Sequence, residues 1–157
     1  MFEYATQDVR TVPPTGTLGD VIRLMATGGF QHVPVVDERG AVVGLVSEGD
    51  VRSLLPASGR DPTGTATLLE RFRVEEVMRR DPVGIERTAS MAEAVDRVLE
   101  HGVGALLVLE EGALVGLLTQ TDLLRAFVDH LGSHTIGLHI EETAPAYDAL
   151  PFSADQH

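Results

Sequence analysis

The hydrophobic residues of this chain follow two patterns, one with helical spacing and one that is typical of buried strands. The helical pattern occurs twice, where apolar residues three and four positions apart share one face. These residues are Leu18, Val21, Ile22, Leu24 and Met25, and then Met91, Ala94, Val95, Val98 and Leu99. Each stretch is followed by two short apolar runs around a polar turn, at 33–36 and 45–46 and at 105–109 and 114–118. The patterns therefore predict a helix followed by a β-hairpin, twice.

Polar and glycine residues mark the ends of these two helices. A Ser or Thr followed three residues later by Asp or Glu has the spacing of a capping box, and glycine is the preferred residue just after a helix. The signals are Thr17, Asp20 and Gly29 in the first half and Ser90, Glu93 and Gly102 in the second. Short extended segments at 9–12 and 83–85 precede the helices, and helices at 48–55 and 120–131 follow the hairpins. Each half is thus predicted to be β-α-β-β-α.

The second half of the sequence repeats the first. Gly29 aligns with Gly102 at an offset of 73 residues, and one deletion near residue 39 changes the offset to 72, which aligns Asp50 with Asp122. A unit of about 50 residues is short for independent stability, so we expect the two copies to pack together.

The repeat divides the chain into four expected segments. They are a first unit at 1–55, a linker rich in Pro, Gly, Ser and Thr at 56–67, a second unit at 68–131, and a tail at 132–157. The second unit is expected to open with a helix at 68–78, and the tail pattern allows a strand at 135–140.

Composition excludes several classes of function. The net charge of −12, from 24 acidic residues and 12 arginines without lysine, disfavours binding to nucleic acid or to anionic lipid. The absence of cysteine excludes disulfides and thiolate metal sites, and the absence of lysine excludes Schiff-base chemistry and a Walker-type phosphate loop. No signal peptide is visible at the start, and the longest apolar stretch, 103–118, is too charged to span a membrane. We therefore expect a cytoplasmic protein.

Two matching segments carry the candidate chemistry, GLVSEGD at 44–50 and GLLTQTD at 116–122. In each, a strand delivers a hydroxyl to the start of a helix that carries a carboxylate one turn in. A carboxylate accepts the two hydroxyls of a ribose, free N–H groups at a helix start favour a phosphate, and the glycine lets a ligand approach the backbone. Ser-x-x-Asp and Thr-x-x-Asp are also capping boxes, however, and spacing alone favours that purely structural interpretation.

The two β-α-β-β-α halves, the Gly-h-h-Ser/Thr-x-x-Asp segments and the VPVVD stretch at 33–37 resemble a tandem CBS-domain pair, or Bateman module, over about residues 6–131. The resemblance implies an α/β fold in which two pseudo-symmetric units pack through their sheets. It also implies clefts between the units that bind AMP, ADP, ATP or S-adenosylmethionine as regulatory ligands. It further implies a homodimer, a regulated protein partner, and no catalysis or required cofactor.

The resemblance also assigns roles to residues. Asp50 and Asp122 would hold the ribose hydroxyls, and Ser47 and Thr119 would contact ribose or phosphate. Further residues would line the pockets around the base and the phosphate: Thr11, Val12, His32, Val33, Pro34, Gly84, Ile85, Ala105 and Leu106. His32 is equally compatible with a half-buried polar residue on a strand.

The chain departs from this pattern beside the motif hydroxyls. Some relatives carry Arg or Lys there, whereas this chain has Glu48 and Gln120, and a glutamate repels phosphate. Arg52 and Arg125, further along the same helices, would have to compensate. We therefore expect two unequal sites, and a ligand with little negative charge remains open.

Two other functions compete with ligand sensing. One is a structural interaction module whose motifs only cap helices, and the other is a nucleotide hydrolase that uses Asp50 or Glu48 with a metal. No cluster of acidic ligands with metal spacing supports the hydrolase. His130 and His134 have a metal-compatible spacing, but Gly132 is expected to end the helix between them. The pair Arg79–Arg80 is interpreted as part of a solvated face.

Overall fold

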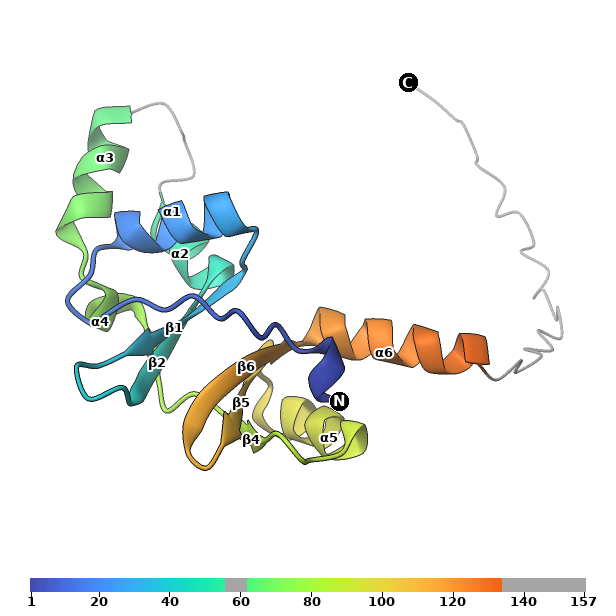
Figure 1. Cartoon of the computed structure of the whole chain (residues 1–157). Coiled ribbons are helices and arrows are strands. Elements are labelled where there is room, and N and C mark those ends of the chain that lie inside the picture. The colour runs from blue at the N-terminus through green and yellow to red at the C-terminus, as the bar shows by residue number, and fades with distance from the viewer. Residues whose placement is uncertain (56–61, 134–157) are drawn as a thin grey trace, which may run out of the picture.

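The computed structural model describes residues 1–55 and 62–133, in two units that lie one above the other (Figure 1). The predicted strand at 135–140 lies outside the described residues. The helices are η1 Phe2–Tyr4, α1 Leu18–Gly28, α2 Glu48–Leu54, α3 Pro62–Arg71, α4 Val74–Val77, α5 Met91–His101 and α6 Gln120–Ser133. The strands are β1 His32–Val36, β2 Val42–Ser47, β3 Arg79–Arg80, β4 Gly84–Glu86, β5 Ala105–Glu110 and β6 Ala113–Thr119. None of the helices within these described ranges has the length and apolar character needed to cross a bilayer.

The helices with the strongest sequence signals, α1 and α5, are confirmed together with their caps. Thr17 and Ser90 each form a complete capping box, and Gly29 and Gly102 end the helices with left-handed φ angles of 67° and 60°. Each cap satisfies backbone N–H groups that would otherwise lack a partner, a contribution of about 1 kcal/mol. Both hairpins, β1–β2 and β5–β6, are antiparallel as predicted.

The mixed α/β fold with two sheets packed against each other is also confirmed. The sheets have the strand orders β1-β2-β3 and β4-β5-β6. Leu45 of β2 and Val42 pack against a buried cluster formed by Ala105, Leu107 and Leu117 of the second sheet. This shared apolar layer joins the two units face to face, while each unit keeps its own core under its helices.

The two units exchange short segments that the repeat pattern does not reveal. Strand β3, which belongs to the start of the second repeat, pairs with β2 of the first sheet at Gly44 and Leu45. In the reverse direction, Thr6 near the start of the chain pairs with Leu117 of β6. Ala5 is correspondingly buried in the core of the second unit, whereas Val74 and Met78 are buried in the core of the first. That the first unit ends at residue 55 and the second begins at residue 68 stays our proposal. The exchanged segments join the two units.

The helix predicted at 68–78 begins earlier than expected and is interrupted, since α3 ends at Arg71 and α4 covers Val74–Val77. Helix α3 begins at Pro62, inside the segment predicted as a linker, because proline is well tolerated in a first helical turn. It ends at Arg71 because the backbone of the next residues pairs with the start of α1. The Phe72 carbonyl accepts from Leu18 N–H at 3.0 Å, and Val74 N–H donates to Gly16 at 2.9 Å. At the other end of the chain, Gly132 does not stop α6, which continues to Ser133.

We predict that Gly44→Ala destabilises the fold through the exchanged strand β3. A Cβ atom at Gly44 would lie 2.8 Å from Met78 Cγ and 3.0 Å from the Arg79 carbonyl oxygen, and that backbone is held in a sheet. Overpacking of this kind costs about 1–3 kcal/mol of unfolding free energy, which urea titration measures.

Gly49→Ala is the matched control, because a Cβ there meets only Ser47 Oγ at 3.6 Å. It is expected to be neutral or to stabilise α2 by up to about 1 kcal/mol. Equal unfolding midpoints for Gly44→Ala and the wild type would contradict the proposed packing.

Candidate functional site

The two motif carboxylates cap helices, as the structural interpretation of the motif predicts. Asp50 Oδ2 accepts hydrogen bonds from the Ser47 backbone N–H at 2.9 Å and from Ser47 Oγ at 2.6 Å, while Asp50 N–H donates to Ser47 Oγ at 3.1 Å. Asp122 Oδ2 accepts the same bonds from Thr119 at 2.9 and 2.7 Å. All of these carboxylate bonds end on Oδ2, so the other oxygen, Oδ1, is left for a different partner.

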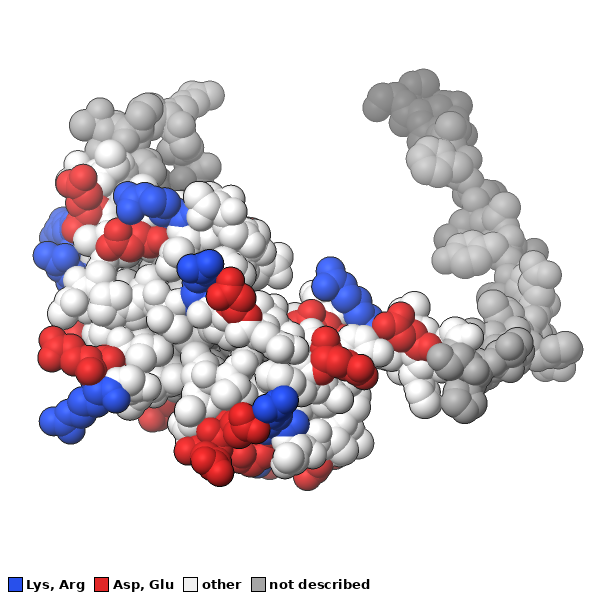
Figure 2. All heavy atoms as spheres, in the orientation of Figure 1, with Lys and Arg blue, Asp and Glu red and all other residues white. Residues whose placement is uncertain are grey.

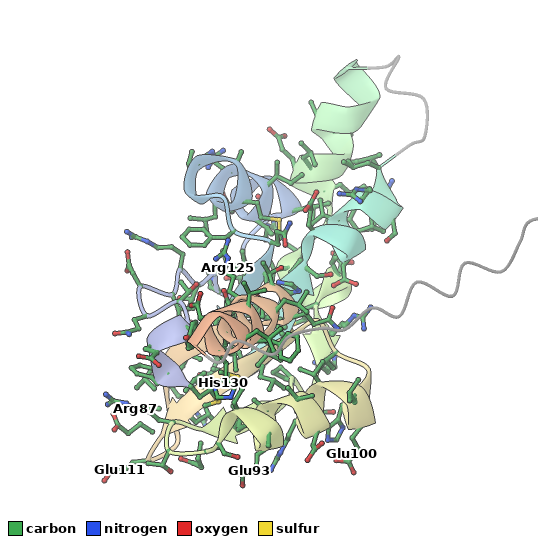
Figure 3. All side chains as sticks on the ribbon, turned by 90° about the vertical axis from the view of Figure 1, so that its right-hand side faces the viewer. Arg87, Glu93, Glu100, Glu111, Arg125 and His130 are labelled. Carbon is green, nitrogen blue, oxygen red and sulfur yellow. The ribbon has the colours of Figure 1, made fainter. Side chains whose placement is uncertain are left out.

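An arginine lies beside Oδ1 of each carboxylate. Arg79 Nε donates to Asp50 Oδ1 at 3.2 Å, and Arg125 Nη1 lies 3.6 Å from Asp122 Oδ1. Figure 3 shows Arg125 on the side of α6 that faces the first unit. The two arginines come from different elements, since Arg79 belongs to the exchanged strand β3 and Arg125 to the same helix as its carboxylate.

Each carboxylate lines a cleft between the two units. The Asp50 cleft has a volume of about 460 Å³ and combines Ser47 and Asp50 of the first unit with the segment 101–105 of the second. The Asp122 cleft has a volume of about 320 Å³ and combines Thr119 and Asp122 with residues 29–32 of the first unit. The clefts are therefore related by the internal repeat, and each needs both units.

The charges of the two clefts differ, but Glu48 and Gln120, from which the inequality was expected, line neither cleft. Arg79, Arg80 and His101 line the Asp50 cleft, together with the acidic Asp50 and Asp81. The Asp122 cleft has one arginine, Arg125, together with Asp122. At the position that corresponds to Arg79 in the repeat, the Asp122 cleft has the neutral Thr6.

Two expectations about arginine are corrected in part. Arg79 and Arg80 are exposed, as expected, but they lie on strand β3 and not on a helix, and they line the Asp50 cleft because β3 pairs with β2 beside Ser47. Arg52 forms an ion pair with Glu48 but lines neither cleft. That pair borders a separate apolar hollow of about 450 Å³ between α1 and α2, away from Asp50.

The face shown in Figure 2 is consistent with the acidic composition of the chain. Arginines are scattered there among acidic side chains and do not form a broad basic area. The arginines of the clefts therefore differ from the other arginines in their position beside the motif carboxylates and do not belong to a larger basic surface.

The structure brings together only part of the predicted site. Ser47, Asp50, His32 and Ala105 line the Asp50 cleft, and Thr119, Asp122 and His32 line the Asp122 cleft. Seven predicted residues are outside the lining of both clefts: Thr11, Val12, Val33, Pro34, Gly84, Ile85 and Leu106. Most of these side chains point into the hydrophobic cores, where Val33 and Leu106 have no exposed surface. Their ligand roles stay predictions without support from the cleft geometry.

The motif glycines admit protein backbone. We expected Gly44 and Gly116 to let a ligand approach, but the space beside Gly44 is occupied by Met78 and Arg79. At Gly116, a Cβ would lie 3.1 Å from the Phe2 ring and 3.3 Å from the Thr6 carbonyl oxygen. Each glycine therefore permits the close approach of the exchanged segment that borders its own cleft.

His32 lies at the centre of the site because it lines both clefts. Its Nδ1 atom is buried and has no hydrogen-bond partner among the described residues, and its Nε2 atom packs against Gly104. Burial lowers the pKa of His32 below its usual value, and this effect outweighs the opposing influence of Asp50 and Glu48. The repeat has Ala105 at the equivalent position, so the imidazole that borders both clefts has no counterpart in the second unit.

Asp50 is held in its ionised form. Burial alone raises the pKa of its carboxyl, but hydrogen bonds from Ser47 and the nearby Arg79 guanidinium outweigh burial, so the pKa is below its usual value. The Asp50 cleft therefore presents a charged acceptor at neutral pH, which suits hydroxyl donors such as a ribose.

The chain has an internally duplicated α/β fold with two clefts between its units, each lined by a carboxylate. These features define a class of paired ligand-binding units. The family is shown by the sequence: a family model described as "CBS domain" matches residues 2–57 and 74–129, and the chain belongs to this family.

Relatives and solved structures have the same fold. The chain is 32% identical over 129 residues to the uncharacterized protein MJ1225 of Methanocaldococcus jannaschii. The matched region covers 80% of the chain and 46% of that protein. It is 32% identical over 126 residues to a CBS domain-containing protein of Dictyostelium discoideum, covering 78% of the chain and 86% of that protein. The chain thus spans about half of MJ1225 but most of the Dictyostelium protein.

The crystal structure of MJ1225, titled a putative archaeal homolog of γ-AMPK, has a TM-score of 0.64 at 29% identity and covers 80% of the chain and 46% of that structure. The crystal structure of CBSX2 in complex with AMP has a TM-score of 0.67 at 24% identity, with coverage of 82% and 95%. At this identity the CBSX2 structure shows a shared fold.

We predict that His32 makes the unfolding free energy depend on pH below neutrality. The folded-state pKa of His32 is lower than the unfolded value of about 6.5, so the unfolded chain binds more protons in this range. Stability is therefore lost as the pH falls from about 6.5 towards the folded-state pKa. In His32→Gln, urea titrations between pH 7 and 5.5 should show a smaller loss than in the wild type.

Titrations at pH 8, where the imidazole is neutral in both states, give the cost of the His32→Gln substitution itself. An unchanged pH slope in the variant would contradict the described burial of His32.

Proposed function

We propose that this CBS-domain pair is a regulatory module that binds adenosine-containing ligands, namely AMP, ADP, ATP or S-adenosylmethionine, in its two clefts. The observation that carries the proposal is the geometry of the two carboxylates. Each uses Oδ2 to cap a helix, has an arginine beside Oδ1, and lines a cleft formed by both units. The AMP in the CBSX2 complex is a property of CBSX2, and it makes AMP the first ligand to test.

The proposed contacts follow from the chemistry of the lining residues. The Asp50 and Asp122 carboxylates would accept hydrogen bonds from ribose hydroxyls, with Ser47 and Thr119 beside them. Apolar residues of the second unit, among them Val103, provide an apolar surface against which the base would pack in the Asp50 cleft. The arginines described above would pair with phosphate, since charge-assisted bonds between arginine and phosphate are strong.

Regulation follows from the position of the clefts between the units. A ligand that contacts both units favours the arrangement in which it binds best, and its differential affinity sets the size of the shift. The regulated partner would bind with different affinity to the different arrangements of the two units. We propose a cytoplasmic location because the ligands considered are cytoplasmic metabolites.

A catalytic role has little support. Within the described ranges, no three His, Cys, Asp or Glu side chains gather in a way that would hold a metal ion. The lowered pKa of Asp50 makes this carboxylate a weak general base, because proton transfer is most efficient when the pKa is near the working pH. His134, the second residue of the histidine pair considered for a metal, lies outside the described residues.

We also propose that the chain forms a homodimer through the outer face of α5 and α6. Helix α6 projects beyond its sheet in Figure 1, and it exposes Leu124, Phe127 and Val128 by 58–65%. Leu99 of α5 is 74% exposed. Exposed apolar side chains that gather on one face indicate an interaction surface.

We predict that Asp50→Ala and Asp122→Ala in one protein weaken AMP binding at least about tenfold in calorimetric titration, because each loses a charged acceptor. The control is Asp20→Ala, which removes a capping box of the same geometry from α1, outside both clefts. Each of these substitutions should cost about 1 kcal/mol of helix-capping stability, while only the cleft variants lose AMP.

A purely structural module predicts a different result. In that case the wild type would bind none of the four ligands at millimolar concentration, and none would raise the melting temperature. Equal AMP affinity in the wild type and the Asp50→Ala, Asp122→Ala variant would also contradict the site.

We predict that Phe127→Glu converts the homodimer to a monomer in multi-angle light scattering, because a two-fold interface would place the unpaired charge on both subunits. Glu38→Arg, an exposed change in the β1–β2 turn, should leave the dimer intact. A wild type that is monomeric at 100 μM would rule out the dimer (roughly a hundred times a micromolar dissociation constant).

A further inference from the structure

We propose that Arg79 determines whether the Asp50 cleft prefers a phosphorylated or an unphosphorylated adenosine ligand, because a ribose must displace Arg79 from Asp50 in order to bind. The proposal rests on the proposed adenosine-binding function and adds to it a residue that determines ligand specificity.

Both oxygens of the Asp50 carboxylate already have partners. Oδ2 accepts from the backbone N–H and the hydroxyl of Ser47, and Oδ1 accepts from Arg79 Nε at 3.2 Å. The bonds to Oδ2 are part of the cap of α2, so their loss would destabilise the helix. The partner that a ribose hydroxyl can replace at lower cost is therefore Arg79.

Arg79 is built to exchange partners. Its backbone is fixed by pairing with Leu45, but its side chain is 69% exposed, whereas the Asp50 side chain is only 16% exposed. Water screens such an ion pair, so the guanidinium can turn away from Asp50 without a large loss. Arg79 and Asp50 line the same cleft, so a released guanidinium stays beside the ligand.

The outcome of the exchange depends on the charge of the ligand. A ligand with a phosphate offers Arg79 a new anionic partner in place of Asp50, and the bond between arginine and phosphate is charge-assisted. Adenosine would replace Arg79 as the partner of the Asp50 carboxylate, but it has no phosphate with which Arg79 can pair. Arg79 therefore favours AMP and opposes adenosine in the same cleft.

The neighbouring Arg80 and the other cleft behave differently. Arg80 also lines the Asp50 cleft, but its Nη2 donates to the Glu75 carbonyl at 3.5 Å and makes no bond to Asp50. In the Asp122 cleft, Thr6 takes the place of Arg79, and Arg125 is 3.6 Å from Asp122, beyond hydrogen-bond distance. Among the described residues that line the two clefts, Arg79 is therefore the arginine whose hydrogen bond to the motif carboxylate a ribose must replace.

The test is calorimetric titration of the full chain with AMP and with adenosine, in the wild type, Arg79→Ala and Arg80→Ala. Arg79→Ala should weaken AMP binding about tenfold and tighten adenosine binding about threefold, because the phosphate partner and the competitor are lost together. Arg80→Ala should weaken AMP without changing adenosine. The same titrations in an Asp122→Ala background read the Asp50 cleft alone.

Arg79→Met, which keeps the aliphatic stem of the side chain, should reproduce the opposite shifts even if Arg79→Ala folds poorly. Arg79→Lys should restore part of the AMP affinity, because it keeps the charge without the planar fork. Equal weakening of both ligands, or no change in either, would overturn the role of Arg79. A wild type that binds neither ligand at millimolar concentration would instead overturn the proposed function itself.

Discussion

The central strands β2 and β6 are each approached at a glycine by a short segment from the other half of the sequence. At Gly44 the arriving segment is Met78–Arg79, and at Gly116 it includes the backbone of Thr6. A Cβ atom at Gly44 would collide with that segment, and a Cβ atom at Gly116 would be in tight contact with it. This close approach ties the units together at their seam, and it places residues from both repeats around each motif carboxylate. The exchanged segments contribute lining residues to both clefts, and the charge of the Asp50 cleft depends on the arginines that β3 brings there.

The structural and functional interpretations of the Ser/Thr-x-x-Asp motif are compatible. One carboxylate oxygen caps the helix, the other lies near Arg79 or Arg125, and the aspartate itself lines a cleft. A helix cap keeps its aspartate ionised and in a fixed orientation, which is also what a binding site for ribose requires. The same bonds explain why Asp50 suits binding better than catalysis, since its lowered pKa leaves it little tendency to take a proton. Because each cleft draws on both units, a ligand bound there links local hydrogen bonds to the arrangement of the whole module.

The sequence predicts the features of this fold that depend on local interactions. Helices α1 and α5, their caps and both hairpins follow from periodicity and from signals only a few residues apart. Strand β3 escapes such reasoning because two residues have no periodicity, and its partner Gly44 is distant in the sequence. Arg79 was missed for the same reason. Val33 and Leu106 were assigned to the site from the family resemblance, and the apolar pattern could not correct this because strands that are apolar along their whole length do not reveal which face each residue occupies. The repeat did predict the paired carboxylates, whereas Arg79 and Arg80, which distinguish the charges of the two clefts, were not among the predicted site residues.

The central claim is that the Asp50 carboxylate holds a ribose at the seam between the units. A crystal structure of the chain with AMP tests it most directly. The account predicts AMP in the Asp50 cleft, its ribose hydroxyls within hydrogen-bond distance of Asp50, and the Arg79 guanidinium turned from Asp50 to the phosphate. Density for AMP only in the apolar hollow between α1 and α2, or a ribose that leaves the ion pair between Arg79 and Asp50 intact, would contradict it.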